Sequence, residues 1–264
     1  MKIWSIANQK GGVGKTTTVV SLAGVFKKEN KRVLIVDLDP HGSVTSYFGN
    51  DPDSIENSVY KLFDNSSSNI SNIILDTEIS HIKLLPASTA LATLDRQLGT
   101  HEGKGLVLKK KLESVKHDFD YVLLDCPPLL GILMVNALAA CEFLLIPVQT
   151  EFLALKGLER MVTTINMITH AQKKKLSNLI IPTMFDRRTR AAIQTLRTLR
   201  EKYGDTVWNG VIPVDTKFRE ASERGLPLPI MLPSSRGTQA YENLYDFLED
   251  IKTPTLKLVN SNGQ

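Results

Sequence analysis

The stretch that decides the fold is Asn8-Gln9-Lys10-Gly11-Gly12-Val13-Gly14-Lys15-Thr16-Thr17. A short apolar run, residues 3–7, precedes it and indicates a β-strand. The segment after it carries Val19, Leu22, Ala23 and Phe26 at helical spacing. In a glycine-rich turn between a strand and a helix, backbone N–H groups can surround an anion. The stretch therefore predicts a phosphate-binding loop.

Two side chains of this loop match the chemistry of a nucleoside triphosphate. Lys15 can reach the β- and γ-phosphates, and the Thr16 hydroxyl can bind Mg²⁺. The usual loop pattern has a glycine where this chain has Gln9, and here a second lysine, Lys10, follows it.

The alternative is a dinucleotide-binding turn that starts at Gly12, with Asp37 as the ribose ligand. Its third glycine position is occupied by Thr17, so triphosphate binding is the favoured interpretation.

The chain has 264 residues, which is long enough for one large α/β domain, and its net charge is +4. Basic residues concentrate towards the C-terminus. Residues 173–236 hold 13 Lys and Arg against 6 Asp and Glu, whereas the rest of the chain holds 19 against 22. This asymmetry suggests a polyanionic partner. Cys126 and Cys141 have no metal-type spacing and are expected to be reduced core residues of a cytosolic protein.

Apolar runs without polar alternation predict strands of a mostly parallel sheet with helices on both faces. We expect strands at residues 3–7, 33–37, 82–85, 120–125, 143–148, 179–182 and 211–213. We expect helices after the loop and at residues 54–63, 88–98, 105–115, 153–173, 187–203 and 238–251. The prediction is a single P-loop NTPase domain over residues 1–252, followed by a polar tail, residues 253–264.

Acidic residues end two of these predicted strands. Asp37 begins the loop Asp37-Leu38-Asp39-Pro40-His41-Gly42, and Asp125 is the last residue of the strand predicted at 120–125. Ligands of open α/β sheets bind at the carboxyl ends of the strands. An aspartate that caps the next helix is the alternative for Asp125, but a phosphate-binding loop in the same chain favours a role in holding Mg²⁺.

By these motifs the chain resembles the ParA/MinD family of deviant-Walker ATPases, and within it the ParA (Soj-like) partition branch. The matching segments run along the whole chain: residues 10–17, 37–42, 120–128, 150–158, 182–190 and 235–237. The family usually has Gln where this chain has His41, and often Asn where it has Ser43. Together with Ser46-Tyr47-Phe48-Gly49, this departure is similar to ParC-type members that position polar chemotaxis arrays.

The resemblance implies an ATPase that encloses ATP and Mg²⁺ in a face-to-face homodimer. Lys15 would act on the nucleotide of its own subunit, Lys10 would reach the nucleotide of the partner, and Asp39 would orient the attacking water. Thr16 and Asp125 would hold Mg²⁺, with Asp37 as outer support. The implied nucleotide contacts are Lys10, Gly11, Gly12, Val13, Gly14, Lys15, Thr16 and Thr17, with Pro213, Val214 and Asp215 near the adenine.

The resemblance also implies sequence-independent DNA binding. A helix over residues 187–203 would place Arg187, Arg190 and Arg197 opposite an apolar face, namely Ala192, Leu196, Leu199 and Tyr203. Lys217 stands where the family carries a DNA-contacting arginine. An ordinary solvated basic face is the alternative.

Two other classes of protein compete with this interpretation. A MinD-like membrane regulator needs a basic amphipathic C-terminal helix, which Pro254 interrupts here. A metabolic P-loop enzyme, such as a synthetase or a reductase with a metal cluster, is the second. We expect no signal peptide, no membrane-spanning segment and a cytoplasmic, nucleoid-associated or polar location. An activating partner or cargo adaptor is implied, and its identity is left open.

Overall fold

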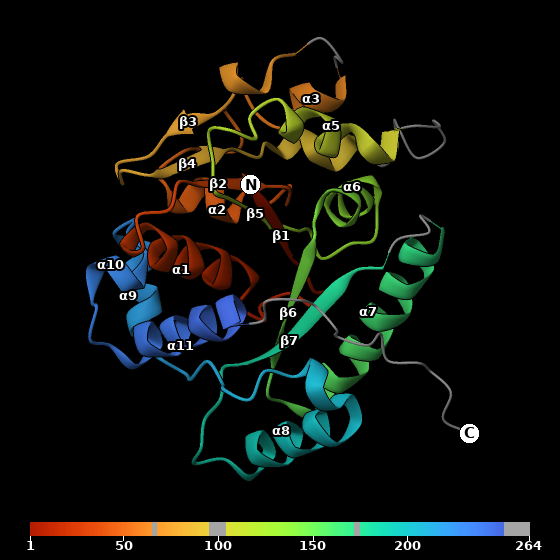
Figure 1. Ribbon diagram of the computed structural model, residues 1–264. Helices are drawn as coiled ribbons and strands as arrows, with labels where there is room; N and C mark the ends of the chain where they lie inside the picture. The colour runs from red at the N-terminus through yellow and green to blue at the C-terminus, as the bar shows by residue number, and fades with distance from the viewer. Residues whose placement is uncertain (65–67, 95–103, 172–174, 251–264) are drawn as a thin grey trace.

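The computed structural model describes residues 1–64, 68–94, 104–171 and 175–250, and all structural statements below concern these residues (Figure 1). Three predictions lie partly or wholly outside them. These are the end of the helix predicted at residues 88–98, Ile251 with the tail 253–264, and the last residues of the helix predicted at 153–173.

A seven-stranded sheet runs through the molecule in the order β3-β4-β2-β5-β1-β6-β7. All neighbouring strands are parallel except β3, which pairs antiparallel with β4 at one edge. The strands are β1 (Lys2–Ile6), β2 (Val33–Asp37), β3 (Leu75–Asp76), β4 (Ile82–Leu85), β5 (Tyr121–Asp125), β6 (Phe143–Gln149) and β7 (Ser177–Thr183).

Helices cover both faces of this sheet, with α1, α10 and α11 on the left and α6 and α7 on the right of Figure 1. The helices are α1 (Lys15–Lys28), α2 (Ser43–Tyr47), α3 (Tyr60–Asp64), α5 (Val107–Glu113), α6 (Ile132–Ala140), α7 (Phe152–Ala171), α8 (Arg190–Tyr203), α9 (Lys217–Glu223), α10 (Leu228–Met231) and α11 (Arg236–Asp250). Short 3₁₀ turns lie at Ile70–Asn72, Thr89–Thr93, Lys104–Leu106 and Gly204–Thr206.

Each strand divides its side chains between two hydrophobic cores. In β2, Val33 and Ile35 enter the core beneath α1 and α11, whereas Leu34 and Val36 enter the core beneath α6 and α7. Because successive side chains of a strand point to opposite faces, a strand that is buried on both faces must be apolar throughout. The structure confirms the predicted single α/β domain with its mostly parallel, doubly covered sheet.

The predicted strand at residues 211–213 is wrong. This segment forms only an isolated bridge between Phe185 and Pro213. Pro213 has no N–H to donate to a ladder, and β7 already ends at Thr183. Next to that end, Met184 has a positive φ of 53°, which turns the chain away from the strand direction.

Two helix predictions were too long, and one strand was missed. Of the helix predicted over residues 54–63, only α3 forms, because Asp51 binds the Ser54 hydroxyl at 2.8 Å and holds the preceding residues in turns. Of the helix predicted at 187–203, the first three residues form a loop, as described below. The two-residue strand β3 is too short to produce a recognisable alternation of apolar residues.

Candidate active site at the phosphate-binding loop

The phosphate-binding loop connects β1 to α1 at the carboxyl end of the sheet. Gly12 and Gly14 have positive φ values of 72° and 90°, which side chains rarely adopt. Gly14 is the N-cap of α1, and no side chain caps this helix end. The first N–H groups of α1 are therefore available to an anion, as the sequence predicted.

Two contacts to distant strands and one contact within the loop hold it in place. The Asn8 amide donates to the Pro147 carbonyl at 2.7 Å, and its oxygen accepts the Lys10 N–H at 3.0 Å. The Thr183 hydroxyl donates to the Val13 carbonyl at 2.8 Å. The roles of Asn8 and Thr183 could not be predicted from the sequence, because no local pattern shows that β6 and β7 end beside the loop.

The two carboxylate oxygens of Asp125 differ in their hydrogen bonding. Its Oδ2 accepts the Thr16 hydroxyl at 2.8 Å. Its Oδ1 is buried and has no hydrogen-bond partner within the described residues. A buried carboxylate oxygen without a partner is costly, and burial together with the neighbouring Asp37 raises the pKa of Asp125 well above its ordinary value.

These residues fit Mg²⁺. A cation beside Asp125 would bind the unpartnered oxygen and offset the free-energy cost of burying the negative charge of the carboxylate. Within the part of the chain that the structure describes, no three His, Cys, Asp or Glu side chains cluster as a metal site. That is consistent with Mg²⁺ in nucleotide sites, where one or two protein ligands suffice and phosphates and waters complete the shell.

Asp37 lies opposite Asp125 in the pairing of β2 with β5. Its Oδ2 accepts the N–H and the hydroxyl of Thr45, at 2.9 and 2.8 Å, and its Oδ1 accepts the Asp39 N–H at 3.1 Å. Burial raises the pKa of Asp37 to about 6. Both oxygens thus organise the loop between β2 and α2, which suits the outer supporting role predicted for this residue.

Asp39 occupies that loop and is 9% exposed. Its Oδ1 lies 2.8 Å from His41 Nδ1 and accepts the His41 N–H at 3.1 Å. His41 stands where the family usually has Gln, and only the structure shows that its side chain contacts Asp39.

The two lysines of the loop differ in environment. Lys15 is buried, with 8% exposure, at the start of α1. Lys10 is partly exposed and forms an ion pair with Glu151, and its Nζ also lies 3.3 Å from Gln149 Oε1. Glu151 immediately precedes α7, so the ion pair attaches Lys10 to that helix.

A cavity of about 560 Å³ opens beside the loop. Pro213, Val214 and Asp215 line it together with Gly14 and residues of β7, α9 and α11. Asp215 uses its own oxygens to accept the N–H groups of Lys217 and Gly237, at 3.0 and 3.1 Å. The structure thus brings the predicted adenine residues to the phosphate-binding loop, and it shows Asp215 binding the first residues of α9 and α11.

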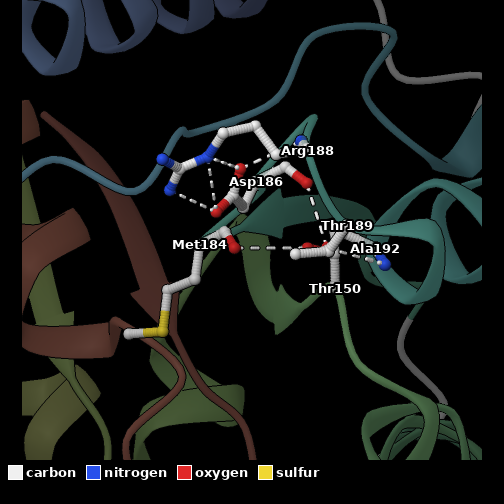
Figure 2. Close-up of polar contacts among 6 residues, drawn as sticks. All are labelled: Thr150, Met184, Asp186, Arg188, Thr189 and Ala192. Atoms are coloured by element: carbon white, nitrogen blue, oxygen red, sulfur yellow. Dashed lines mark hydrogen bonds and ion pairs between the residues drawn. The ribbon is translucent and has the colours of Figure 1, made fainter.

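Arg187 does not lie on a helix, contrary to prediction. Figure 2 shows the loop that replaces its helical turn: Asp186 forms a two-pronged ion pair with Arg188, and Thr189 donates its hydroxyl to the Asp186 carbonyl at 3.0 Å. The Thr189 oxygen also accepts the Ala192 N–H and caps α8. Asp186 and Thr189 therefore start the helix at Arg190.

The remaining predicted DNA residues lie on two different helices. Arg190 and Arg197 are exposed on α8, opposite the predicted apolar face, which is buried. Lys217 begins α9, and α8 packs on α7 whereas α9 packs on α10. Arg197 pairs with Glu201 and Lys217 with Glu220, both at 2.8 Å, so their charges are partly balanced.

The sequence of this chain is similar to a known protein family and to named proteins. The family described as an AAA domain matches residues 1–178. The sporulation initiation inhibitor protein Soj of Bacillus subtilis (strain 168) is 37% identical over 244 residues, covering 92% of this chain and 96% of that protein. The chromosome-partitioning ATPase Soj of Treponema pallidum (strain Nichols) is 36% identical over 238 residues, covering 90% and 92%.

A solved structure with a similar fold carries the name of a synthase, unlike the Soj proteins. Cobyrinic acid a,c-diamide synthase of Mycobacterium smegmatis, crystallised with an ATP analogue and magnesium, has a TM-score of 0.83 and 32% identity, with 95% of each chain covered. Within the described residues of the present chain, no helix has the length and apolar character needed to cross a bilayer.

Proposed function

This chain belongs to the ParA/Soj family of partition ATPases, and we propose that it binds Mg²⁺ and ATP at the phosphate-binding loop. In this proposal an ATP-bound homodimer holds DNA without sequence preference and positions or segregates a DNA cargo. Slow hydrolysis, stimulated by a partner protein, releases the dimer. The observation that carries the proposal is the buried Oδ1 of Asp125. It has no hydrogen-bond partner among the described residues, while Oδ2 of the same carboxylate accepts the Thr16 hydroxyl.

Nucleotide binding divides between the loop and the cavity. Lys15 and the free N–H groups of α1 bind the phosphates, and the base occupies the cavity near Pro213 and Val214. Bound at this place, Mg²⁺ would supply positive charge beside the phosphates. Thr16 and Asp125 would hold the ion, and Asp37 keeps the adjoining loop in place.

Hydrolysis in such sites depends on positioning and on positive charge near the γ-phosphate. We assign the orientation of the attacking water to Asp39, which leads from β2 and is largely buried. Lys15 supplies positive charge from its own subunit. Lys10, which is partly exposed at the mouth of the loop, supplies it to the nucleotide of the second subunit.

Exposed apolar residues support the dimer. Phe152 and Leu153 are 70% and 65% exposed and directly follow Glu151, the partner of Lys10. Leu129 and Leu130, which follow β5, are 72% and 51% exposed. Large apolar side chains at such exposure favour contact with another surface, and a second copy of the chain brought face to face at Lys10 would cover Phe152 and Leu153.

Exposed basic residues support DNA binding. Arg187 and Arg190 are exposed at and before the start of α8, and neither has an ion pair among the described residues. Two subunits present two copies of this surface, so dimerisation raises the effective concentration of the second copy. Binding of this kind would associate the protein with the nucleoid.

We propose DNA partition as the role of the protein and assign no particular cargo. The compared Soj relatives do not support the ParC-type role in chemotaxis arrays that Ser46-Tyr47-Phe48-Gly49 suggested, and that role stays a prediction. A metabolic ATPase is the second candidate, because the Mycobacterium smegmatis structure carries the name of a synthase.

Co-sedimentation with DNA distinguishes the two candidates. Purified protein is mixed with unrelated DNA duplexes and centrifuged with ATP, with ADP or without nucleotide. We expect the wild type to pellet with DNA only when ATP and Mg²⁺ are present. Asp39→Ala should pellet at least as well, because it binds ATP but leaves the water unoriented, and Lys15→Ala should stay in solution. Equal sedimentation in all nucleotide states contradicts the proposal.

A further inference from the structure

His41 lies two residues after Asp39 in the loop between β2 and α2. We propose that His41 is a positioning residue for hydrolysis, which holds one oxygen of the Asp39 carboxylate and thereby leaves the other directed to the attacking water. The inference rests on the proposed role of Asp39, and the experiment below separates the two.

The hydrogen bonds of Asp39 are unequally divided between its two oxygens. Oδ1 accepts the His41 N–H at 3.1 Å and lies 2.8 Å from the ring Nδ1. A carboxylate can only accept, so Nδ1 carries the proton and the ring donates it. Oδ2 has no hydrogen-bond partner among the described residues.

The backbone brings the ring to this place. Asp39 donates its own N–H to Asp37 Oδ1 at 3.1 Å, and its carbonyl accepts the Gly42 N–H at 2.8 Å. This bond closes the four residues from Asp39 to Gly42 into a tight turn, which ends at Gly42 with a positive φ of 60°. The turn fixes the backbone of Asp39 to the buried Asp37, and the His41 ring then restrains the free end of the side chain.

Because His41 is much more exposed than Asp39, its positioning role can be tested without disturbing the packing of the fold. The side chain of His41 is 80% exposed, whereas that of Asp39 is 12% exposed. Replacing an exposed ring removes little buried contact, so the fold and the nucleotide cavity should tolerate the change. A lower rate of hydrolysis would then report on the orientation of Asp39.

The test compares three variants. His41→Asn keeps an N–H donor where Nδ1 stands, because both groups lie one bond beyond Cγ. His41→Gln moves the donor one bond further, and His41→Leu removes it. Steady-state ATP hydrolysis is measured with DNA at saturating Mg²⁺, and nucleotide binding is measured separately with a fluorescent ATP analogue.

We expect His41→Leu to lower kcat about 3- to 10-fold, the effect of losing one exposed hydrogen bond to a charged group. Its KM and its nucleotide affinity should stay within about twofold of the wild type, and His41→Asn should restore most of kcat. His41→Gln should fall between the two.

A double variant tests whether His41 acts through Asp39. On an Asp39→Ala background, where residual hydrolysis is followed with γ-labelled ATP, adding His41→Leu should cause no further loss. An equal loss on both backgrounds, an equal kcat for Asn and Leu, or a change in KM instead of kcat would overturn the inference. If His41→Leu matches the wild type while Asp39→Ala abolishes hydrolysis, the inference fails and the proposed function stands. If Asp39→Ala hydrolyses normally, the proposed role of Asp39 fails as well.

Discussion

The ion pair between Lys10 and Glu151 predicts that Glu151 restrains dimerisation. Lys10 Nζ pairs with Glu151 Oε1 and lies 3.3 Å from Gln149 Oε1, so the ammonium group is bound within its own subunit. To reach the nucleotide of a second subunit, as proposed, it must leave Glu151. Glu151→Gln keeps the shape of the side chain and removes the charge that holds Lys10.

The size of the effect on dimerisation follows from the exposure of the ion pair. The side chains of Lys10 and Glu151 are 31% and 40% exposed, and an ion pair of this kind contributes about 0.2–1 kcal/mol after solvent screening. One pair opens in each subunit of a dimer, so the dimer gains about 0.4–2 kcal/mol when the charge is removed. That corresponds to a dimer dissociation constant lower by about 2- to 30-fold.

Sedimentation velocity over a protein concentration series measures this constant. The Asp39→Ala background with ATP and Mg²⁺ keeps hydrolysis from reversing the dimer. Glu159→Gln is the matched control, since Glu159 lies on α7 and pairs with Lys202 at 2.6 Å, with both side chains 50% exposed. We expect tighter dimers for Glu151→Gln and no change for Glu159→Gln. Weaker dimers for Glu151→Gln, or the same change in both variants, would refute the reasoning.

Three further predictions concern the phosphates, the buried acids and DNA. Lys15→Ala should lower affinity for a fluorescent ATP analogue at least tenfold, because a buried cation is lost from the phosphates; retained affinity contradicts the assignment. Burial raises the pKa of Asp37 from 3.8 to about 6, so the folded state binds its proton more tightly than the unfolded state, and stability falls as pH rises from about 4 to 6. In urea unfolding without nucleotide, the free energy of unfolding of Asp37→Asn should therefore rise by up to about 3 kcal/mol relative to that of the wild type between pH 4 and pH 7. A difference that stays constant over this range contradicts the raised pKa of Asp37. Arg190→Ala should weaken DNA retention on filters and reduce the salt slope by about one per binding unit, whereas Arg188→Ala, whose charge Asp186 already binds, should change it less; equal effects would contradict a specific role for Arg190.

The sequence determined the features that depend on neighbouring residues. Strand β2 was predicted with its observed ends, since an apolar run buried on both faces has no polar alternation. The phosphate-binding loop was predicted because a glycine-rich turn between a strand and a helix lets backbone N–H groups surround an anion. The structure adds that Gly12 and Gly14 have positive φ values. The same reasoning failed where a few side chains decide the local structure, as in the turn of Asp186 and Thr189 before α8.

Tertiary structure decided which distant residues meet. The cavity joins Gly14 to Pro213, the Thr183 hydroxyl holds the Val13 carbonyl, and Glu151 binds Lys10. Periodicity records which face of an element is buried, but it contains no information about which other element lies against that face. The unpartnered oxygen of Asp125 is equally invisible in the sequence, because only the folded chain shows which donors fail to reach it.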